Sequence, residues 1–293
     1  MRILVTGAGG FIGFHALLGL RRKGHVVIGT THDYAVKDAN MMVGDVTDRR
    51  FIERLVVEND IDVIIHLAAR SIVKHSWKSP WESYLTNVMG TVSVFEAARI
   101  KGDVHVIYQS TDKVYGDGVG KSTEDRLVPT EPYGTSKACG DFVAQSYMMH
   151  YGIKTTILRP CNVYGFDTNN RIIPNTIRSC LQGIDPVIYK GTVGMRQYVF
   201  IEDLIDNYEK IILENVTGAH NVAPMFSIRT QEDVVLEILK HFPGMQPVYV
   251  DSKNTGELDE QSLIPDENLS CPTSFEDGIT KTVAMYRKIT EVT

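Results

Sequence analysis

The sequence predicts an α/β fold, a Rossmann-type doubly wound parallel sheet with a smaller C-terminal lobe. Two observations support it. Strand and helix patterns alternate along most of the chain, and such alternation implies parallel strands joined by helical crossovers. The chain also opens with a β-branched strand pattern, a glycine-rich turn and a helix pattern. The pattern loosens after about residue 166, so we expect one domain at 1–165, with return segments near 195–224, and a lobe at 166–293.

The individual elements follow from hydrophobic periodicity. Short apolar runs predict strands at 3–6, 26–30, 63–67, 104–109, 154–159 and 219–222. Amphipathic stretches predict helices near 11–23, 48–58, 82–100, 134–151, 171–182, 202–213, 230–240 and 274–290. Long loops are expected at 112–131, 160–171 and 183–200.

The glycine-rich turn after the first strand reads Gly7-Ala-Gly-Gly10-Phe-Ile-Gly13. Glycines allow the backbone to approach a pyrophosphate, which then lies at the N-terminus of the following helix. An ordinary strand-to-helix turn is the alternative. Because the turn follows a strand and opens a helix, we interpret it as a dinucleotide-binding site.

Two further segments place reactive groups where ligands bind in an open α/β sheet. QSTDKVYG follows an apolar strand and brings together Thr111, Asp112 and Lys113. The segment YGTSK opens a helix and puts Tyr133 and Lys137 on one helix face. An ammonium beside a phenol lowers the pKa of the phenol, so Tyr133 is a candidate general base.

Composition narrows the class of protein. The chain has 293 residues and a net charge of −6, which argues against a nucleic-acid surface. We expect no membrane span and no cleavable signal. The four cysteines lack the spacing of a metal site or of a disulfide framework, so we expect no metal and a reducing, cytoplasmic location.

The whole chain resembles the extended short-chain dehydrogenase/reductases, in particular the nucleotide-sugar epimerase and dehydratase group. The resemblance rests on short motifs that occur in the same order: GDVTD (44–48), HLAA (66–69), TNVMGT (86–91), STDKVYG (110–116), YGTSK (133–137), RPCNVYG (159–165), RIIP (171–174) and RQYVFIED (196–203). It implies a homodimer that binds NAD and a nucleotide-diphosphate sugar, with NADP not excluded.

The pair Asp112-Lys113 resembles CDP-glucose 4,6-dehydratases and inverting UDP-GlcNAc 4,6-dehydratases. Plain 4-epimerases usually carry small or apolar residues there, and retaining dTDP-glucose 4,6-dehydratases usually carry Asp-Glu. The chain departs from the CDP-glucose enzymes in lacking their Trp-containing insertion before the Tyr. The resemblance therefore implies an NDP-sugar 4,6-dehydratase, with base and hexose open. A 4-epimerase or 4-reductase and a non-catalytic NAD(P) sensor are the alternatives.

By this resemblance, Tyr133 deprotonates the sugar 4-hydroxyl during oxidation at C4, Lys137 holds it near phenolate, and Thr111 bonds the same oxygen. Asp112 then protonates the departing 6-hydroxyl and Lys113 removes the C5 proton. These roles need opposite pKa shifts, which a simple ion pair opposes. A solvated loop pair is the alternative interpretation.

The resemblance also implies binding residues. The expected cofactor-binding set is Gly7, Gly10, Phe11, Ile12, Gly13, Asp45, Val46, Leu67, Ala68, Ala69, Asn87, Tyr133 and Lys137. The expected substrate-binding set is Ser71, Asn162, Arg171 and Arg196. The lobe at 166–293 is expected to be mainly substrate-binding. Asp45 has an alternative as a helix N-cap, for which Asp48 competes. Asn87 has an alternative as a buried helix residue bonded to backbone, and Arg196 has one as a surface charge.

Thr31 stands where an acidic ribose-binding residue is usual, with Asp33 two residues on, and no arginine follows; NAD is favoured over NADP. The helices near 82–100 and 134–151 carry extra apolar stripes, and the family pairs these helices across a dimer two-fold. A monomer is the alternative. We expect His66 to be a core histidine.

Overall fold

The computed structural model describes residues 1–33, 40–190, 194–225, 227–251 and 260–290. Two compact units are present. The first comprises residues 1–116, 123–160 and 205–221, and the second comprises 117–122, 161–204 and 222–293. The chain therefore passes between the units several times. Among the described helices, none is long and apolar enough to cross a membrane.

The first unit contains a seven-stranded sheet. Its strands are β1 (Arg2–Thr6), β2 (Val26–Thr31), β3 (Met41–Val43), β4 (Val63–His66), β5 (His105–Gln109), β7 (Thr155–Pro160) and β11 (Gly218–Val222). Their order is β11-β7-β5-β4-β1-β2-β3, and every pairing from β7 to β3 is parallel. The predicted Rossmann-type α/β fold is thus confirmed.

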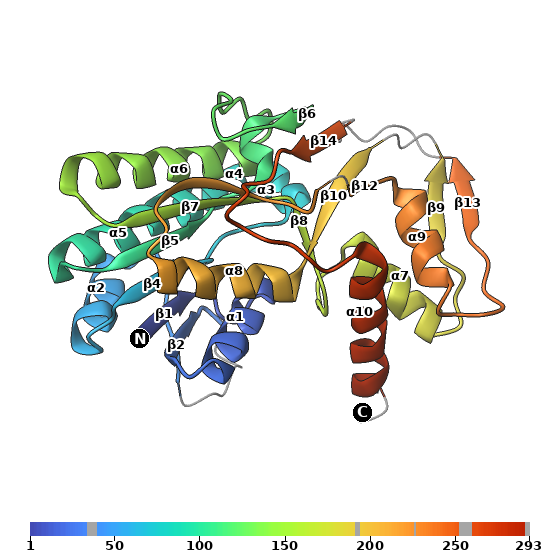
Figure 1. Cartoon of the computed structure of the whole chain (residues 1–293), viewed down its shortest axis with the longest axis horizontal. Coiled ribbons are helices and arrows are strands. Elements are labelled where there is room, and N and C mark those ends of the chain that lie inside the picture. The colour runs from blue at the N-terminus through green and yellow to red at the C-terminus, as the bar shows by residue number, and fades with distance from the viewer. Residues whose placement is uncertain (34–39, 191–193, 226, 252–259, 291–293) are drawn as a thin grey trace. The chain divides into compact units, whose positions relative to one another are not determined.

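Helices cover both faces of this sheet because its strand residues alternate between the faces. Leu4, Ile64 and Val106 pack into one core with α2 (Arg49–Glu58), α5 (Gly90–Lys101) and α6 (Pro132–Tyr151). On the other side, α1 (Phe11–Arg22) meets α8 (Ile201–Glu214), where a Cβ on Gly19 would lie 2.6 Å from a methyl of Ile205. Figure 1 shows α1 and α8 on one side of the sheet and α5 and α6 on the other.

The order of the strands reverses at β1, which lies between β2 and β4. In open α/β sheets such a switch point opens a crevice at the carboxyl ends of the strands. The segments that follow β1, β4 and β5 therefore meet at one edge. These are the glycine turn, the segment 67–71 and the segment 110–113.

The helix expected near 82–100 is not continuous. Helices α3 (Val73–Lys78) and α4 (Pro80–Tyr84) precede a single π-helical turn, Leu85–Met89, which leads directly into α5. Such π turns insert an extra residue into a helix and occur often at functional sites. The prediction of one regular helix was wrong because an i→i+5 turn has no characteristic residue pattern.

The second unit contains a smaller sheet of order β12-β10-β14-β6, with β8 also paired to β10. Its strands are β6 (Gly118–Lys121), β8 (Asn162–Tyr164), β10 (Met195–Phe200), β12 (Ile228–Arg229) and β14 (Glu260–Leu263). A separate parallel pair is β9 (Val187–Lys190) with β13 (Val248–Asp251), and the helices are α7 (Ile172–Leu181), α9 (Gln231–Leu239) and α10 (Phe275–Thr290).

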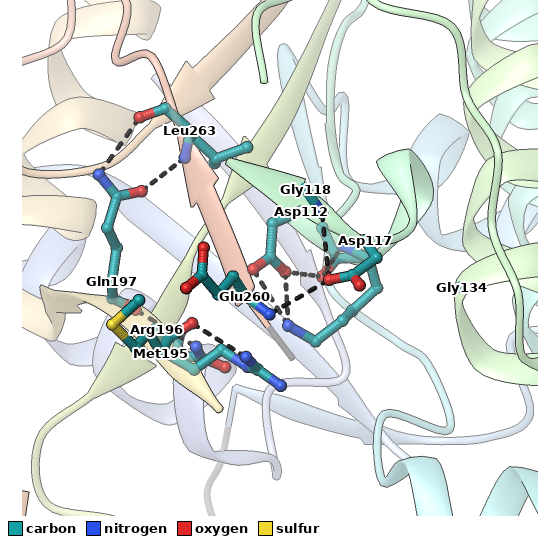
Figure 2. A network of polar contacts seen from close by, with 12 residues as sticks. Asp112, Asp117, Gly118, Gly134, Met195, Arg196, Gln197, Glu260 and Leu263 are labelled. Carbon is teal, nitrogen blue, oxygen red and sulfur yellow. Dashed lines mark hydrogen bonds and ion pairs between the residues drawn. The ribbon is translucent and has the colours of Figure 1, made fainter. Parts of the chain in front are cut away.

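A buried side chain fastens the centre of this smaller sheet. Gln197 Nε2 donates to the Leu263 carbonyl at 3.2 Å, and the Leu263 N–H donates to Gln197 Oε1 at 2.7 Å (Figure 2). At the other end of β14, the N–H groups of Gly118 and Glu260 both donate to the Asp117 carboxylate. Side-chain bonds thus reinforce short strands that have few backbone bonds.

The predicted loops at 112–131, 160–171 and 183–200 were partly wrong. They contain β6, β8, β9, β10 and a 3₁₀ helix, η2 (Asp112–Tyr115). These strands are three to six residues long and their partners are distant in sequence, as β6 and β14 are. Local periodicity cannot identify a strand that is defined chiefly by such a partner.

Candidate active site

The glycine turn after β1 packs directly against the segment after β4. Gly7 has φ of +69°, and a Cβ there would lie 2.7 Å from Ala68 Cα. A Cβ on Gly13 would lie 2.2 Å from the Gly7 carbonyl oxygen. Both positions therefore require glycine, whereas Phe11 and Ile12 open α1 and are half-buried. The result is a tight backbone cradle at a helix N-terminus, which suits a pyrophosphate.

Buried hydrogen bonds hold the segment after β4 in place. Thr6 Oγ1 accepts from the N–H groups of Leu67 (3.1 Å) and Ala68 (3.2 Å), and it bonds His66 Nδ1 at 2.7 Å. The other ring nitrogen of His66 bonds Thr91 Oγ1 at 3.1 Å. Burial lowers the pKa of His66 to about 3, with a smaller contribution from the nearby Lys137. The prediction of a satisfied core histidine is confirmed.

Asn87 lies on the π turn and connects two parts of the site. Its Oδ1 accepts from the Arg70 N–H at 2.8 Å, and its Nδ2 donates to Ser136 Oγ at 2.8 Å. Ser136 Oγ in turn donates to the Tyr133 carbonyl at 2.7 Å. Asn87 is buried. It thereby ties the segment after β4 to the first turn of α6, while its expected cofactor contact stays a prediction.

The acidic residues after β3 have separate structural roles. Asp48 is the N-cap of α2 and accepts from the N–H groups of Arg50 and Phe51. Asp45 is not this cap; its Oδ1 accepts from the N–H and the hydroxyl of Thr47, both at 2.8 Å. Asp45 is exposed and Val46 is buried beside Gly90. Asp45 thus remains a candidate for binding the cofactor.

Thr111, Asp112 and Lys113 form one connected group at the end of β5. Thr111 caps η2 by accepting from the Lys113 N–H, and its hydroxyl donates to Asp112 Oδ1 at 2.9 Å. Lys113 Nζ lies 3.2 and 3.1 Å from the two Asp112 oxygens. The side chains are only 4% (Asp112) and 17% (Lys113) exposed. This burial argues against a solvated loop pair.

The N-terminus of α6 packs against η2. A Cβ on Gly134 would lie 2.8 Å from the Lys113 carbonyl oxygen, so the two segments touch. Glu131 caps the helix by accepting from the N–H groups of Tyr133 and Gly134, each at 2.6 Å. Burial raises the pKa of Glu131, although these backbone bonds and Lys113 oppose the rise. The sequence reasoning missed Glu131, because glutamate is not among the preferred N-cap residues.

Lys137 is buried one turn after Tyr133. Burial lowers its pKa to about 7, and the charge of Asp141 opposes that change. Asp141 is held in place by Arg159, through bonds of 2.9 and 3.0 Å, and by the Ser110 hydroxyl at 3.0 Å. The buried ion pair fastens α6 to β7 and to the end of β5, which fixes the helix that carries Lys137.

The expected substrate residues fall into two groups. Ser71 is exposed on the segment after β4, in the first unit. Asn162, Arg171 and Arg196 belong to the second unit. Asn162 Nδ2 donates to the Gln197 carbonyl at 3.2 Å, so Asn162 and Arg196 lie on adjacent strands.

The two arginines have different settings. Arg171 is the N-cap residue of α7, and its Nε lies 3.8 Å from Asp167 Oδ2. Arg196 Nη1 donates to the Met195 carbonyl at 2.9 Å. The side chains of Arg196 and Gln197 extend to opposite sides of β10 (Figure 2).

The described residues contain no cluster of three or more potential metal ligands.

Comparison with known families decides the class of this protein. Residues 3–223 match the NAD dependent epimerase/dehydratase family. The chain belongs to this family. The match covers the glycine turn, the Thr111–Lys113 group and the Tyr133–Lys137 helix. It also agrees with the family that the sequence motifs indicated.

Curated relatives of this epimerase/dehydratase family member differ in length. A trifunctional UDP-glucose 4,6-dehydratase/3,5-epimerase/reductase from Arabidopsis thaliana is 28% identical over 97% of the chain. The chain spans 46% of that relative, about half its length. A dTDP-glucose 4,6-dehydratase from Mycobacterium tuberculosis is 30% identical, with 98% of the chain and 93% of the relative covered.

Solved structures of similar proteins have the same fold. The dTDP-glucose 4,6-dehydratase DesIV from Streptomyces venezuelae, with NAD and TYD bound, has a TM-score of 0.87 and 27% identity, and 98% of this chain and 97% of that chain are covered. A UDP-glucose 4-epimerase from Thermus thermophilus, in complex with NAD, has a TM-score of 0.89 and 25% identity, with coverage of 98% and 99%.

Proposed function

We propose that the protein is an NDP-sugar 4,6-dehydratase, which converts an NDP-hexose to an NDP-4-keto-6-deoxyhexose. The observation that carries the proposal is the buried Asp112–Lys113 pair, bonded to Thr111 and packed against the first turn of α6. Oxidation at C4 alone needs no such pair, whereas elimination of a hydroxyl needs an acid and a base. The full-length similarity to dTDP-glucose 4,6-dehydratases supports the same activity.

The cofactor we propose is NAD, held by the glycine cradle between Gly7, Gly13 and the segment at Ala68. Glycine at both positions lets the turn close tightly, because a Cβ at either would collide with neighbouring backbone. Such a turn lets the main chain approach a pyrophosphate. The N-terminus of α1 favours the pyrophosphate charge. When bound, NAD supplies the acceptor for the C4 hydride and later the donor to C6. Similar proteins of the family contain NAD in their structures.

Tyr133 would take the proton of the sugar 4-hydroxyl. Glu131 fixes its backbone through the Tyr133 N–H, and Ser136 fixes its carbonyl. Lys137 in its ammonium form favours the phenolate through charge. Because burial lowers the pKa of Lys137 to about 7, its ammonium form is only marginally stable near neutrality. Thr111 would bond the same sugar oxygen.

The Asp112–Lys113 pair would carry out the elimination. The roles proposed for this pair need a protonated Asp112 and a neutral Lys113. This neutral pair differs from the ion pair by the transfer of one proton from Lys113 Nζ to the Asp112 carboxylate. The ion pair and the neutral pair hold the same number of protons, and contacts of 3.1 and 3.2 Å permit direct transfer. Asp112 would then give that proton to the leaving 6-hydroxyl, and Lys113 would accept the C5 proton and return a proton to C5 when C6 receives the hydride. The two short contacts support this proposal for the pair.

A 4-epimerase is the alternative, favoured by the similarity to a UDP-glucose 4-epimerase. It would use Thr111, Tyr133 and Lys137 without loss of a group. The purified protein should be incubated with UDP-, dTDP- and CDP-hexoses and the products analysed by mass spectrometry. Dehydration gives a product lighter by one water, whereas epimerisation leaves the mass unchanged.

The substrate diphosphate is proposed to bind Asn162, Arg171 and Arg196, with Ser71 at the sugar. Arginine suits this role because its planar fork matches phosphate oxygens. The second unit would therefore serve as the substrate-binding lobe.

A homodimer through α5 and α6 is proposed because Phe142 and Met149 of α6 are 57% and 67% exposed. Large apolar side chains in such positions commonly mark an interface.

All four cysteines are free, which is compatible with the proposed cytoplasmic location.

A further inference from the structure

We propose that Tyr108 on β5 is a positioning residue that sets the place of Lys137 and stabilises its ammonium form. The inference deepens the proposed function and rests on it, since that function gives Lys137 its role beside Tyr133. Tyr108 belongs to none of the sequence motifs that indicated the site. It would act through Lys137 rather than on the substrate.

Tyr108 contacts both ends of Lys137. The lysine Nζ lies 4.3 Å from the centroid of the Tyr108 ring, within the range of a cation–π interaction. The Tyr108 hydroxyl donates to the main-chain carbonyl of Lys137 at 3.0 Å. One side chain therefore fixes the backbone of the lysine on α6 and also provides the surface on which its amine rests.

Close packing holds the Tyr108 ring in this place. The side chain is fully buried, and a Cβ on Gly140 would lie 2.2 Å from its hydroxyl oxygen. The ring also lies 5.9 Å from the ring of His66, its register partner on β4. The absence of a side chain at Gly140 is thus what admits the hydroxyl between β5 and α6. A ring confined in this way gives Lys137 a fixed support.

The charged and titratable groups around Lys137 provide little stabilisation for its buried ammonium form. On its own helix Asp141 favours the ammonium, but that carboxylate also serves Arg159 and Ser110. On β4, His66 is neutral and buried. Tyr133 precedes Lys137 by one turn. Burial disfavours the ammonium, and the face of an aromatic ring attracts a cation without adding another charge that must be buried.

The test is a titration of Lys137 in the intact protein by NMR of ¹³Cε-labelled lysine, with Lys137→Met identifying the resonance. In Tyr108→Leu the midpoint should fall by about one pH unit, because the cation–π contact is lost. In Tyr108→Phe, which keeps the ring, the midpoint should stay close to that of the unaltered protein. An unchanged midpoint in Tyr108→Leu would overturn the inference.

Tyr108→Leu could fail to fold because it removes a buried ring. A fluorinated phenylalanine introduced at position 108 is therefore the matched partner of Tyr108→Phe, since it keeps the shape of the ring and weakens its quadrupole. The inference predicts a lower midpoint for the fluorinated ring than for the plain one. Equal midpoints would contradict it.

Turnover separates this inference from the proposed function. In Tyr108→Leu the alkaline limb of the pH–rate profile should move to lower pH, as the ammonium is lost earlier. If Lys137→Met keeps its turnover, the proposed catalytic set is wrong. If Lys137→Met is inactive while Tyr108→Leu keeps the profile and the midpoint of the unaltered protein, only the role of Tyr108 is refuted.

Discussion

Asp112 presents both carboxylate oxygens to the Lys113 ammonium, at 3.1 and 3.2 Å, and this pair lies almost entirely out of solvent. The Thr111 hydroxyl also donates a hydrogen bond to one of these two carboxylate oxygens. Low exposure and the bond from Thr111 distinguish this pair from an exposed ion pair, which contributes little to stability.

Substitution within the pair should stop elimination after oxidation has occurred. Asp112→Asn cannot protonate the leaving hydroxyl, and Lys113→Met cannot accept the C5 proton. In both variants we expect slow release of 4-keto-6-deoxy product. Enzyme-bound NADH should accumulate, and its absorbance measures that accumulation. Exchange of the C5 proton with deuterated solvent should fall mainly in Lys113→Met. Unchanged dehydration in both variants would remove the pair from the mechanism.

Tyr133→Phe should lose the oxidation step itself. Removing a positioned base lowers turnover by about 10²- to 10⁴-fold, while nucleotide-sugar affinity measured by calorimetry should change little. Tyr151→Phe is a matched control, because Tyr151 ends the same helix and is 59% exposed. Turnover near that of the unaltered enzyme in Tyr133→Phe would show that another group is the base.

Glu131 should contribute to stability through the cap of α6. Glu131→Ala leaves the N–H groups of Tyr133 and Gly134 without this partner. We expect a loss of about 1 kcal/mol in the free energy of unfolding, measured with denaturant. Glu131→Ser should recover most of that loss, since serine is a preferred cap. Equal stability of the alanine variant and the unaltered protein would contradict a capping role.

Two buried histidines should make the protein sensitive to acid. Burial lowers the pKa of His66 to about 3 and that of His105 to about 4. As pH falls below 6.5, the unfolded chain takes up protons that the folded chain does not. Stability is therefore lost from pH 6.5 down to about 4 for His105 and down to about 3 for His66. Between about pH 7.5 and about pH 5.5, each of these histidines should lower the free energy of unfolding by about 1.4 kcal/mol.

The histidine prediction is checked by denaturant unfolding at several pH values. His105→Gln should reduce the pH dependence by about the share of one histidine. A stability that is flat over this range in the unaltered protein would show that these histidines are protonated in the fold.

The sequence predicted the parts of the site that depend on local pattern. The glycine turn, the Thr111–Lys113 segment and the Tyr133–Lys137 helix each combine a strand or helix signal with unusual residue types. The π turn at Asn87 was missed because helical periodicity continues through it. Glu131 and Tyr108 were missed for another reason. Their roles come from tertiary contacts, with α6 packing on η2 and on β5, and Tyr108 has the pattern of an ordinary core strand residue.

The central claim is dehydration through transient oxidation at C4, and transfer of a label tests it most directly. The enzyme should be given an NDP-hexose that carries deuterium at C4, and the product examined by mass spectrometry and NMR. A 4,6-dehydratase should release a product that has lost one water and carries the deuterium at C6. A product of unchanged mass, with the deuterium at an inverted C4, would show instead that the protein is an epimerase and that the Asp112–Lys113 pair does not perform elimination.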